Sequence, residues 1–139
     1  MGVPRSLVTA YRAAHYVVFD EERPAVLHIG ERCAALDELL EQENAWSAAF
    51  VTAFNPGGLP RHESENVEAF GRLCEDVNAT PYAVYLGEGR DPKGEWPPEA
   101  SLLVVGISRA DAESLGRRFG QNAIVFVERG GAPELVLLA

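Results

Sequence analysis

Five polar residues in separate segments of the chain are the candidates for chemistry: Asn55, Asn66, Glu99, Ser101 and Gln121. The amide side chains among them can each donate and accept hydrogen bonds. Glu99 can accept a hydrogen bond, ligate a cation or act as a general base. This combination predicts binding of a small polar molecule, such as a nucleotide or a metal-bound metabolite. If the protein is an enzyme, these groups favour acid–base or metal-assisted hydrolysis.

A divalent cation is an alternative ligand, because carboxylate and amide oxygens are hard ligands. The acidic residues that could join Glu99 and Asn55 are Glu65, Glu88, Asp91 and Glu95. Their spacing matches no cation-binding loop, so we predict no cofactor and no metal site. The glycine-rich segment 87–94 lacks the Gly-Lys-Ser/Thr ending of a phosphate-binding loop, and no nucleophile motif such as Gly-x-Ser-x-Gly is found.

Composition narrows the class of protein. The 139 residues include 12 Lys and Arg against 21 Asp and Glu, which gives a net charge of -9. No nucleic-acid partner is expected, because phosphate neutralisation requires clustered basic residues. No membrane association is expected either, since no apolar run approaches the roughly 18 residues that span a bilayer and residues 1–6 lack the apolar stretch of a secretory signal. We therefore expect one cytoplasmic domain over residues 1–139 that is large enough to fold without a disulfide.

Hydrophobic periodicity and turn residues predict the elements that position the candidate residues. Residues 1–47 are expected to form an extension, with a short helix in 7–16, a hairpin of strands 15–19 and 25–29 around the turn 20–24, and a helix over 33–43. Further strands are predicted at 48–54, 82–86, 101–107, 123–128 and 134–138, and the segment 87–100 is predicted to be a long loop. Ser64 is a suitable N-cap for a helix to Val77. Ser108 and Asp111 form a capping box for a helix that ends at Gly120.

The order of elements from residue 48 predicts the fold class α+β. We expect a ferredoxin-like βαββαβ core with an antiparallel sheet over 48–139, an N-terminal hairpin and helix extension, and an extra C-terminal strand. In this topology the four core strands lie in the order fourth, first, third, second, and the first strand is antiparallel to both neighbours. One edge of the sheet then collects all five candidate residues, with the loop that carries Trp96 above them.

Two interpretations of this convergence stay open. In the first, the protein binds a ligand at this edge, and at least one of Asn55 and Gln121 faces solvent until the ligand arrives. In the second, the polar side chains only form hydrogen bonds with the loop backbone. The protein is then a non-catalytic regulatory or interaction module, which could form a homodimer through a sheet edge or a helix face. A pocket that buries Glu99 and shifts its pKa would favour the first.

Several short motifs, taken in order, carry a family resemblance. They are Tyr11-Arg12-Ala13 with Tyr16, the segment 50–56, Glu65-Asn66, Gly87-Glu88-Gly89, Trp96 with 99–104, and the segment 119–123. Together they resemble the small bacterial domain-of-unknown-function family 3293, over nearly the whole chain. That family has a hydroxyl residue after the Asn-Pro pair, where this chain has Gly57 and Gly58. The resemblance supports the element order and implies no activity.

Overall fold

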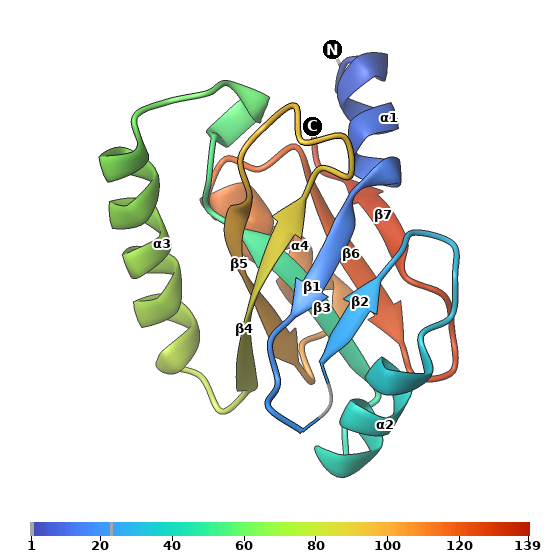
Figure 1. Cartoon of the computed structure of the whole chain (residues 1–139). Helices are drawn as coiled ribbons and strands as arrows, with labels where there is room; N and C mark the ends of the chain where they lie inside the picture. The colour runs from blue at the N-terminus through green and yellow to red at the C-terminus, as the bar shows by residue number, and fades with distance from the viewer. Residues whose placement is uncertain (1, 23) are drawn as a thin grey trace.

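A computed structural model describes residues 2–22 and 24–139 of the chain. Arg23, within the predicted turn 20–24, lies outside the described residues. The described chain folds into helices and one antiparallel sheet (Figure 1). The helices are α1 (Arg5–Ala13), α2 (Ala34–Gln42), α3 (Glu63–Asn78) and α4 (Arg109–Arg118), with a short 3-10 turn at Pro56–Gly58. The strands are β1 (His15–Val18), β2 (Ala25–Leu27), β3 (Ser47–Thr52), β4 (Ala83–Arg90), β5 (Glu99–Val105), β6 (Ala123–Glu128) and β7 (Glu134–Leu137).

The sheet is larger than the four-stranded core that the sequence predicts. The described strands lie in the order β2-β1-β4-β5-β3-β6-β7. Within it, β4, β5, β3 and β6 occur in the predicted order, and β3 is antiparallel to both β5 and β6. The N-terminal hairpin joins the same sheet, because β1 pairs with β4. The mixed helix and antiparallel-sheet class is therefore confirmed, and the sheet is larger than the predicted core because the N-terminal hairpin and β7 extend it.

Strand β3 explains how the sheet is covered on both faces. Its alternate side chains point to opposite sides, and all four residues from Ala48 to Val51 are buried. Ala48 and Phe50 pack in a cluster with α2, β1 and β2. Ala49 and Val51 pack in a second cluster with α3 and α4. Helices α3 and α4 thus cover one face, while the sheet curls so that the hairpin and α2 enclose the other (Figure 1).

Hydrogen bonds close the curled sheet at the end where α2 lies. The backbone N–H of Gly30, after edge strand β2, donates to the carbonyl of Pro133, just before edge strand β7, at 2.8 Å. The N–H of Gly130 also donates to the Asp37 carboxylate of α2 at 2.9 Å. These contacts connect the segments next to the two edge strands, β2 and β7, so the curled sheet forms a half-barrel that is held together at this end. The other end contains the candidate residues.

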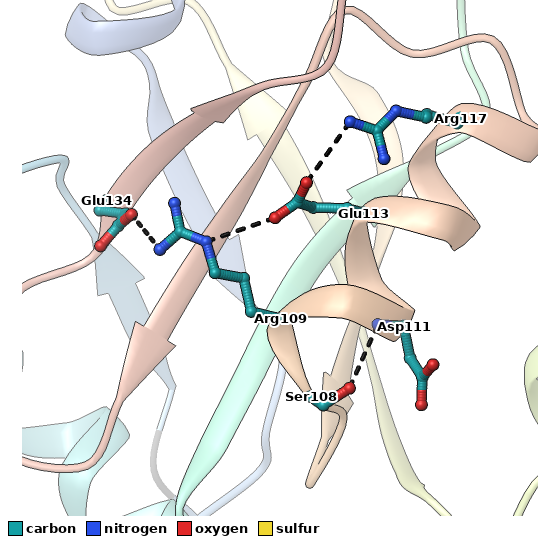
Figure 2. A network of polar contacts seen from close by, with 6 residues as sticks. All are labelled: Ser108, Arg109, Asp111, Glu113, Arg117 and Glu134. Atoms are coloured by element: carbon teal, nitrogen blue, oxygen red, sulfur yellow. Dashed lines mark hydrogen bonds and ion pairs between the residues drawn. The ribbon is translucent and has the colours of Figure 1, made fainter.

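The predicted cap of α4 is confirmed. The Ser108 hydroxyl accepts a hydrogen bond from the backbone N–H of Asp111 at 3.1 Å (Figure 2). Arg109 in the first turn then pairs with Glu113 and with Glu134 of β7, and Glu113 also pairs with Arg117 (Figure 2). A local sequence signal therefore fixes the helix start, and the exposed ion pairs link α4 to the sheet.

Two local predictions are wrong. Helix α3 begins before Ser64, with His62 at the N-cap position and no side-chain cap. The first hydrogen bonds of the helix instead use the backbone of His62, whose carbonyl accepts from the N–H groups of Glu65 and Asn66 at 3.1 Å. Strand β4 also continues into the predicted loop 87–100, since residues 87–90 pair with β1. An added Cβ at Gly87 would lie 2.3 Å from the Val17 carbonyl oxygen, so glycine here serves close strand approach and not a turn.

Candidate functional site

A cavity of about 220 Å³ is lined by residues of α1, β1, β5 and the loop after β3. These segments meet at the end of the sheet opposite α2 (Figure 1). Helix α1 contributes Leu7, Ala10 and Tyr11 to its wall, and the loop before β5 contributes Trp96. Most of the remaining wall is apolar and comes from strands and from the loop after β3. Five lining side chains are aromatic, and they are Tyr11, Tyr16, Phe50, Phe54 and Trp96. Segments that are far apart in the sequence therefore form one cavity with a mainly apolar wall.

Four of the five candidate residues line this cavity: Asn55, Glu99, Ser101 and Gln121. Strand register brings them together, because Ser101 of β5 pairs with Thr52 of β3 on one side and with Gly87 of β4 on the other. Glu99 lies opposite Gly89, which has no side chain to fill the space. The fifth residue, Asn66, is buried behind Asn55.

Asn55 is held by hydrogen bonds to the protein at both ends of its amide. Its Nδ2 donates to Glu99 Oε2 at 2.7 Å, and its Oδ1 accepts from Asn66 Nδ2 at 2.8 Å and from the Arg61 N–H at 3.2 Å. Its backbone lies in the left-handed region, at φ 47°. Both ends of the amide are thus bonded within the protein, and Nδ2 orients the Glu99 carboxylate.

Asn66 completes this arrangement from the first turn of α3. Its Oδ1 accepts from the Asn55 N–H at 2.9 Å and from Arg61 Nε at 2.8 Å. Arg61 Nη2 donates to the Ala53 carbonyl at 3.2 Å. A chain of polar contacts therefore runs from Arg61 through the amides of Asn66 and Asn55 to Glu99, and it fixes the loop after β3 against α3.

Gln121 and Ser101 also use their donor groups within the protein. Gln121 Nε2 donates to the carbonyls of Phe54 and Phe119, at 3.1 and 3.2 Å. The Ser101 hydroxyl donates to the carbonyl of Glu99 at 3.0 Å. Glu99 and two loop carbonyls therefore occupy one hydrogen of the Asn55 amide and both hydrogens of the Gln121 amide. The expectation that at least one of these two residues faces solvent and contacts a ligand stays a prediction.

Burial sets the electrostatics of the cavity. It raises the pKa of the Glu99 carboxyl above the ordinary value of 4.5, and the hydrogen bond from Asn55 offsets part of this rise. Burial also raises the pKa of Tyr16, with smaller contributions from Tyr11 and Glu99. Tyr16 thus keeps its proton and donates it to the carbonyl of Tyr11. A carboxyl group with such a shift, held in a cavity, is typical of binding and catalytic sites.

The acidic residues proposed as alternative cation ligands do not gather. Of these residues only Glu99 lines the cavity. Glu88 pairs with Arg90, and the Asp91 carboxylate accepts from backbone N–H groups of its own turn. Within the described residues, no group of three or more His, Cys, Asp or Glu side chains is placed to hold a metal ion.

Sequence reasoning missed the part of the wall that comes from α1 and β1. Tyr11 and Tyr16 occur among the resemblance motifs, but neither lies in a segment that the four-strand topology brings to this edge. Helix α1 reaches the cavity by packing on the loop after β3. An added Cβ at Gly58 would lie 2.7 Å from Leu7 Cδ1, and φ is +77° there. The pair of glycines after Asn55-Pro56 was the available signal for this close approach.

The comparisons with known proteins give one match. The model of a family described as a protein of unknown function, DUF3293, matches residues 51–124, more than half of the chain. The chain belongs to the DUF3293 family. The matched DUF3293 segment contains all five candidate residues, while Tyr11 and Tyr16 lie before it. No curated protein and no solved structure matches.

None of the helices in the described chain is long and apolar enough to cross a bilayer.

Proposed function

We propose that the protein binds a small, largely apolar molecule in the cavity beneath α1 and holds the polar end of that molecule at Glu99. The supporting observation is the cavity itself, with about 220 Å³ of space, a mainly apolar wall and polar groups from separate segments at one end. Small-molecule sites commonly combine an apolar wall with a few convergent polar groups.

The side chains that line the cavity favour an uncharged or cationic ligand over the nucleotide or metal-bound metabolite that the sequence suggests. Among the described lining residues there is no Lys, Arg or His. Phosphate groups are bound by cationic side chains or by free backbone N–H groups, and a buried anion without such partners is strongly disfavoured. A nucleotide or a metal-bound phosphate ester therefore suits this cavity less well than an uncharged or cationic molecule.

A cavity-filling variant tests the proposal. Ala10 of α1 lines the cavity, whereas neighbouring Thr9 is exposed. We expect indole, a small apolar probe, to raise the melting temperature of the wild type and of the Thr9→Phe control, because a ligand that binds only the folded state stabilises it. Ala10→Phe should abolish the shift. An equal shift in both variants, or none in the wild type, would overturn the proposal.

The alternative is a non-catalytic interaction module whose partner is a second copy of the chain. The observation that favours it is the exposure of Trp46, Leu59 and Val67, at 72%, 72% and 57%. These side chains come from different segments, and single exposed apolar residues are common on monomeric proteins. Sedimentation over a range of concentrations tests this alternative, which requires a dimer. The cavity supports ligand binding better.

We also propose that the scaffold of this site is a ferredoxin-like unit. The order of β4, β5, β3 and β6, together with α3 and α4 on one face, supports this interpretation.

A further inference from the structure

The side-chain donors at the polar end of the cavity are mostly occupied. Asn55 Nδ2 donates to Glu99, and Gln121 Nε2 donates to two backbone carbonyls. The hydroxyl groups of Ser101, Thr52 and Tyr16 each donate to a backbone carbonyl. The amide of Gln121 cannot be reversed without placing its oxygen against two carbonyl oxygens. Of these groups, only Asn55 Nδ2 keeps a hydrogen without a described acceptor, because an amide nitrogen carries two hydrogens.

Acceptors at the same end remain available. Glu99 Oε2 receives the hydrogen bond from Asn55, and no described residue donates to Glu99 Oε1 or to Gln121 Oε1. The lining side-chain donors with a hydrogen that has no described acceptor are Asn55 Nδ2, the Trp96 indole N–H and the Tyr11 hydroxyl, which itself accepts from Asn122 at 3.2 Å. The polar end is thus complementary to a ligand that donates hydrogen bonds.

Charge complementarity favours a cationic donor over a neutral one. Glu99 is the only acidic side chain among the described lining residues, and no basic side chain faces it across the cavity. The wall includes five aromatic side chains, and aromatic ring faces attract cations. The formal net charge of -9 also attracts cations to the protein as a whole.

We infer that the ligand of this cavity is a small organic amine, whose protonated nitrogen donates to Glu99 Oε1 and Gln121 Oε1 while its apolar body fills the aromatic wall. This inference rests on the proposed function and narrows it to one class of ligand. Asn55, Asn66 and Arg61 act as positioning residues, because their contacts hold the other carboxylate oxygen of Glu99 in place.

Three probes with a common phenyl body test the inference: 2-phenylethylamine, 2-phenylethanol and phenylacetate. They present a cation, a neutral hydroxyl and an anion, and calorimetric titration near neutral pH gives the affinity of each. We expect the amine to bind at least about tenfold more tightly than the alcohol and phenylacetate to bind most weakly. Lowering the pH through the Glu99 pKa should weaken amine binding and leave alcohol binding unchanged.

A matched pair of variants tests whether Glu99 causes the preference for the amine. Glu99→Gln should remove the preference for the amine, whereas the exposed and distant Glu128→Gln should keep it. If the alcohol and the amine bind equally well to the wild type, the amine inference is overturned and the cavity still binds a ligand. If the amine binds but Ala10→Phe leaves it unaffected, the cavity is not the site, and both proposals fail.

Discussion

Asn55 illustrates how a residue chosen for its chemistry can act through its neighbour. Asparagine tolerates the left-handed backbone region better than most residues, and the amide of Asn55 bonds to Asn66 and Glu99 from this strained position. The sequence indicates that Asn55 and Glu99 converge. It cannot indicate that both ends of the amide are occupied, because this depends on Asn66 and Arg61 in the next segment.

A second left-handed asparagine provides a control for this role. Asn44 has φ 56°, is exposed, and takes part in no side-chain hydrogen bond described in the structure. Both Asn44→Ala and Asn55→Ala place alanine in an unfavourable conformation. We expect Asn55→Ala to cost at least about 1 kcal/mol more in free energy of unfolding, because it also removes the bonds to Asn66 and Glu99. Urea denaturation measures the difference, and equal costs would show that the contacts add no stability.

Glu99 should make stability depend on pH. Its pKa in the folded state lies above the ordinary value of 4.5 because the carboxyl is buried. The protonated form therefore favours folding, and this contribution is complete below the unfolded pKa and is lost as the pH rises through the folded pKa. Glu99→Gln cannot ionise and should show no such loss. Denaturation from pH 4 to 8 should give a variant that gains stability over wild type as the pH increases; a constant difference would contradict the shifted pKa.

At the level of elements, two glycines in β4 mark where β1 lies against it. An added Cβ at Gly87 would meet the Val17 carbonyl at 2.3 Å and the Phe50 ring at 2.9 Å, whereas at Gly89 the nearest atom is Tyr16 Cδ1 at 4.0 Å. We expect Gly87→Ala to destabilise the protein by about 2 kcal/mol or more through overpacking. Gly89→Ala should cost less than about 1 kcal/mol. Thermal denaturation compares the two, and equal costs would mean that β1 does not pack on Gly87.

The elements also show which sequence signals are reliable. Ser108 caps α4 because its partner, the Asp111 N–H, lies three residues away and no distant group competes for the hydroxyl. Ser64 fails as a cap because α3 already begins at Glu63, and the N–H groups of Glu65 and Asn66 donate to the backbone carbonyl of His62. Strand β4 extends beyond the predicted Leu86 because β1 supplies a partner from far along the chain. The cap at Ser108 was therefore predictable from neighbouring residues, whereas the end of β4 depends on a strand that is distant in the sequence.

For the whole molecule, the order of β4, β5, β3 and β6 followed from element order and the rules of strand connection. These rules also placed Asn55, Glu99, Ser101 and Gln121 at one edge, where all four now line one cavity. The cavity itself could not be predicted, because its wall depends on α1 and β1. These two elements pack where Leu7 lies against Gly58 and Val17 lies against Gly87. Hydrophobic periodicity in the sequence does not predict such contacts.

The hydrogen bond between Gly30 and Pro133 has a kinetic consequence. It joins segments near opposite ends of the chain, and contacts of such large sequence separation form slowly because a long loop must close first. The contact between Gly130 and Asp37 belongs to the same closure. We expect this end of the half-barrel to assemble after the folding transition state, so that Asp37→Ala speeds unfolding while the folding rate stays unchanged. Stopped-flow tryptophan fluorescence measures both rates, and slower folding in the variant would place this closure in the folding nucleus. If the closure is late, a ribosome must release almost the complete chain before the two edges of the sheet can meet.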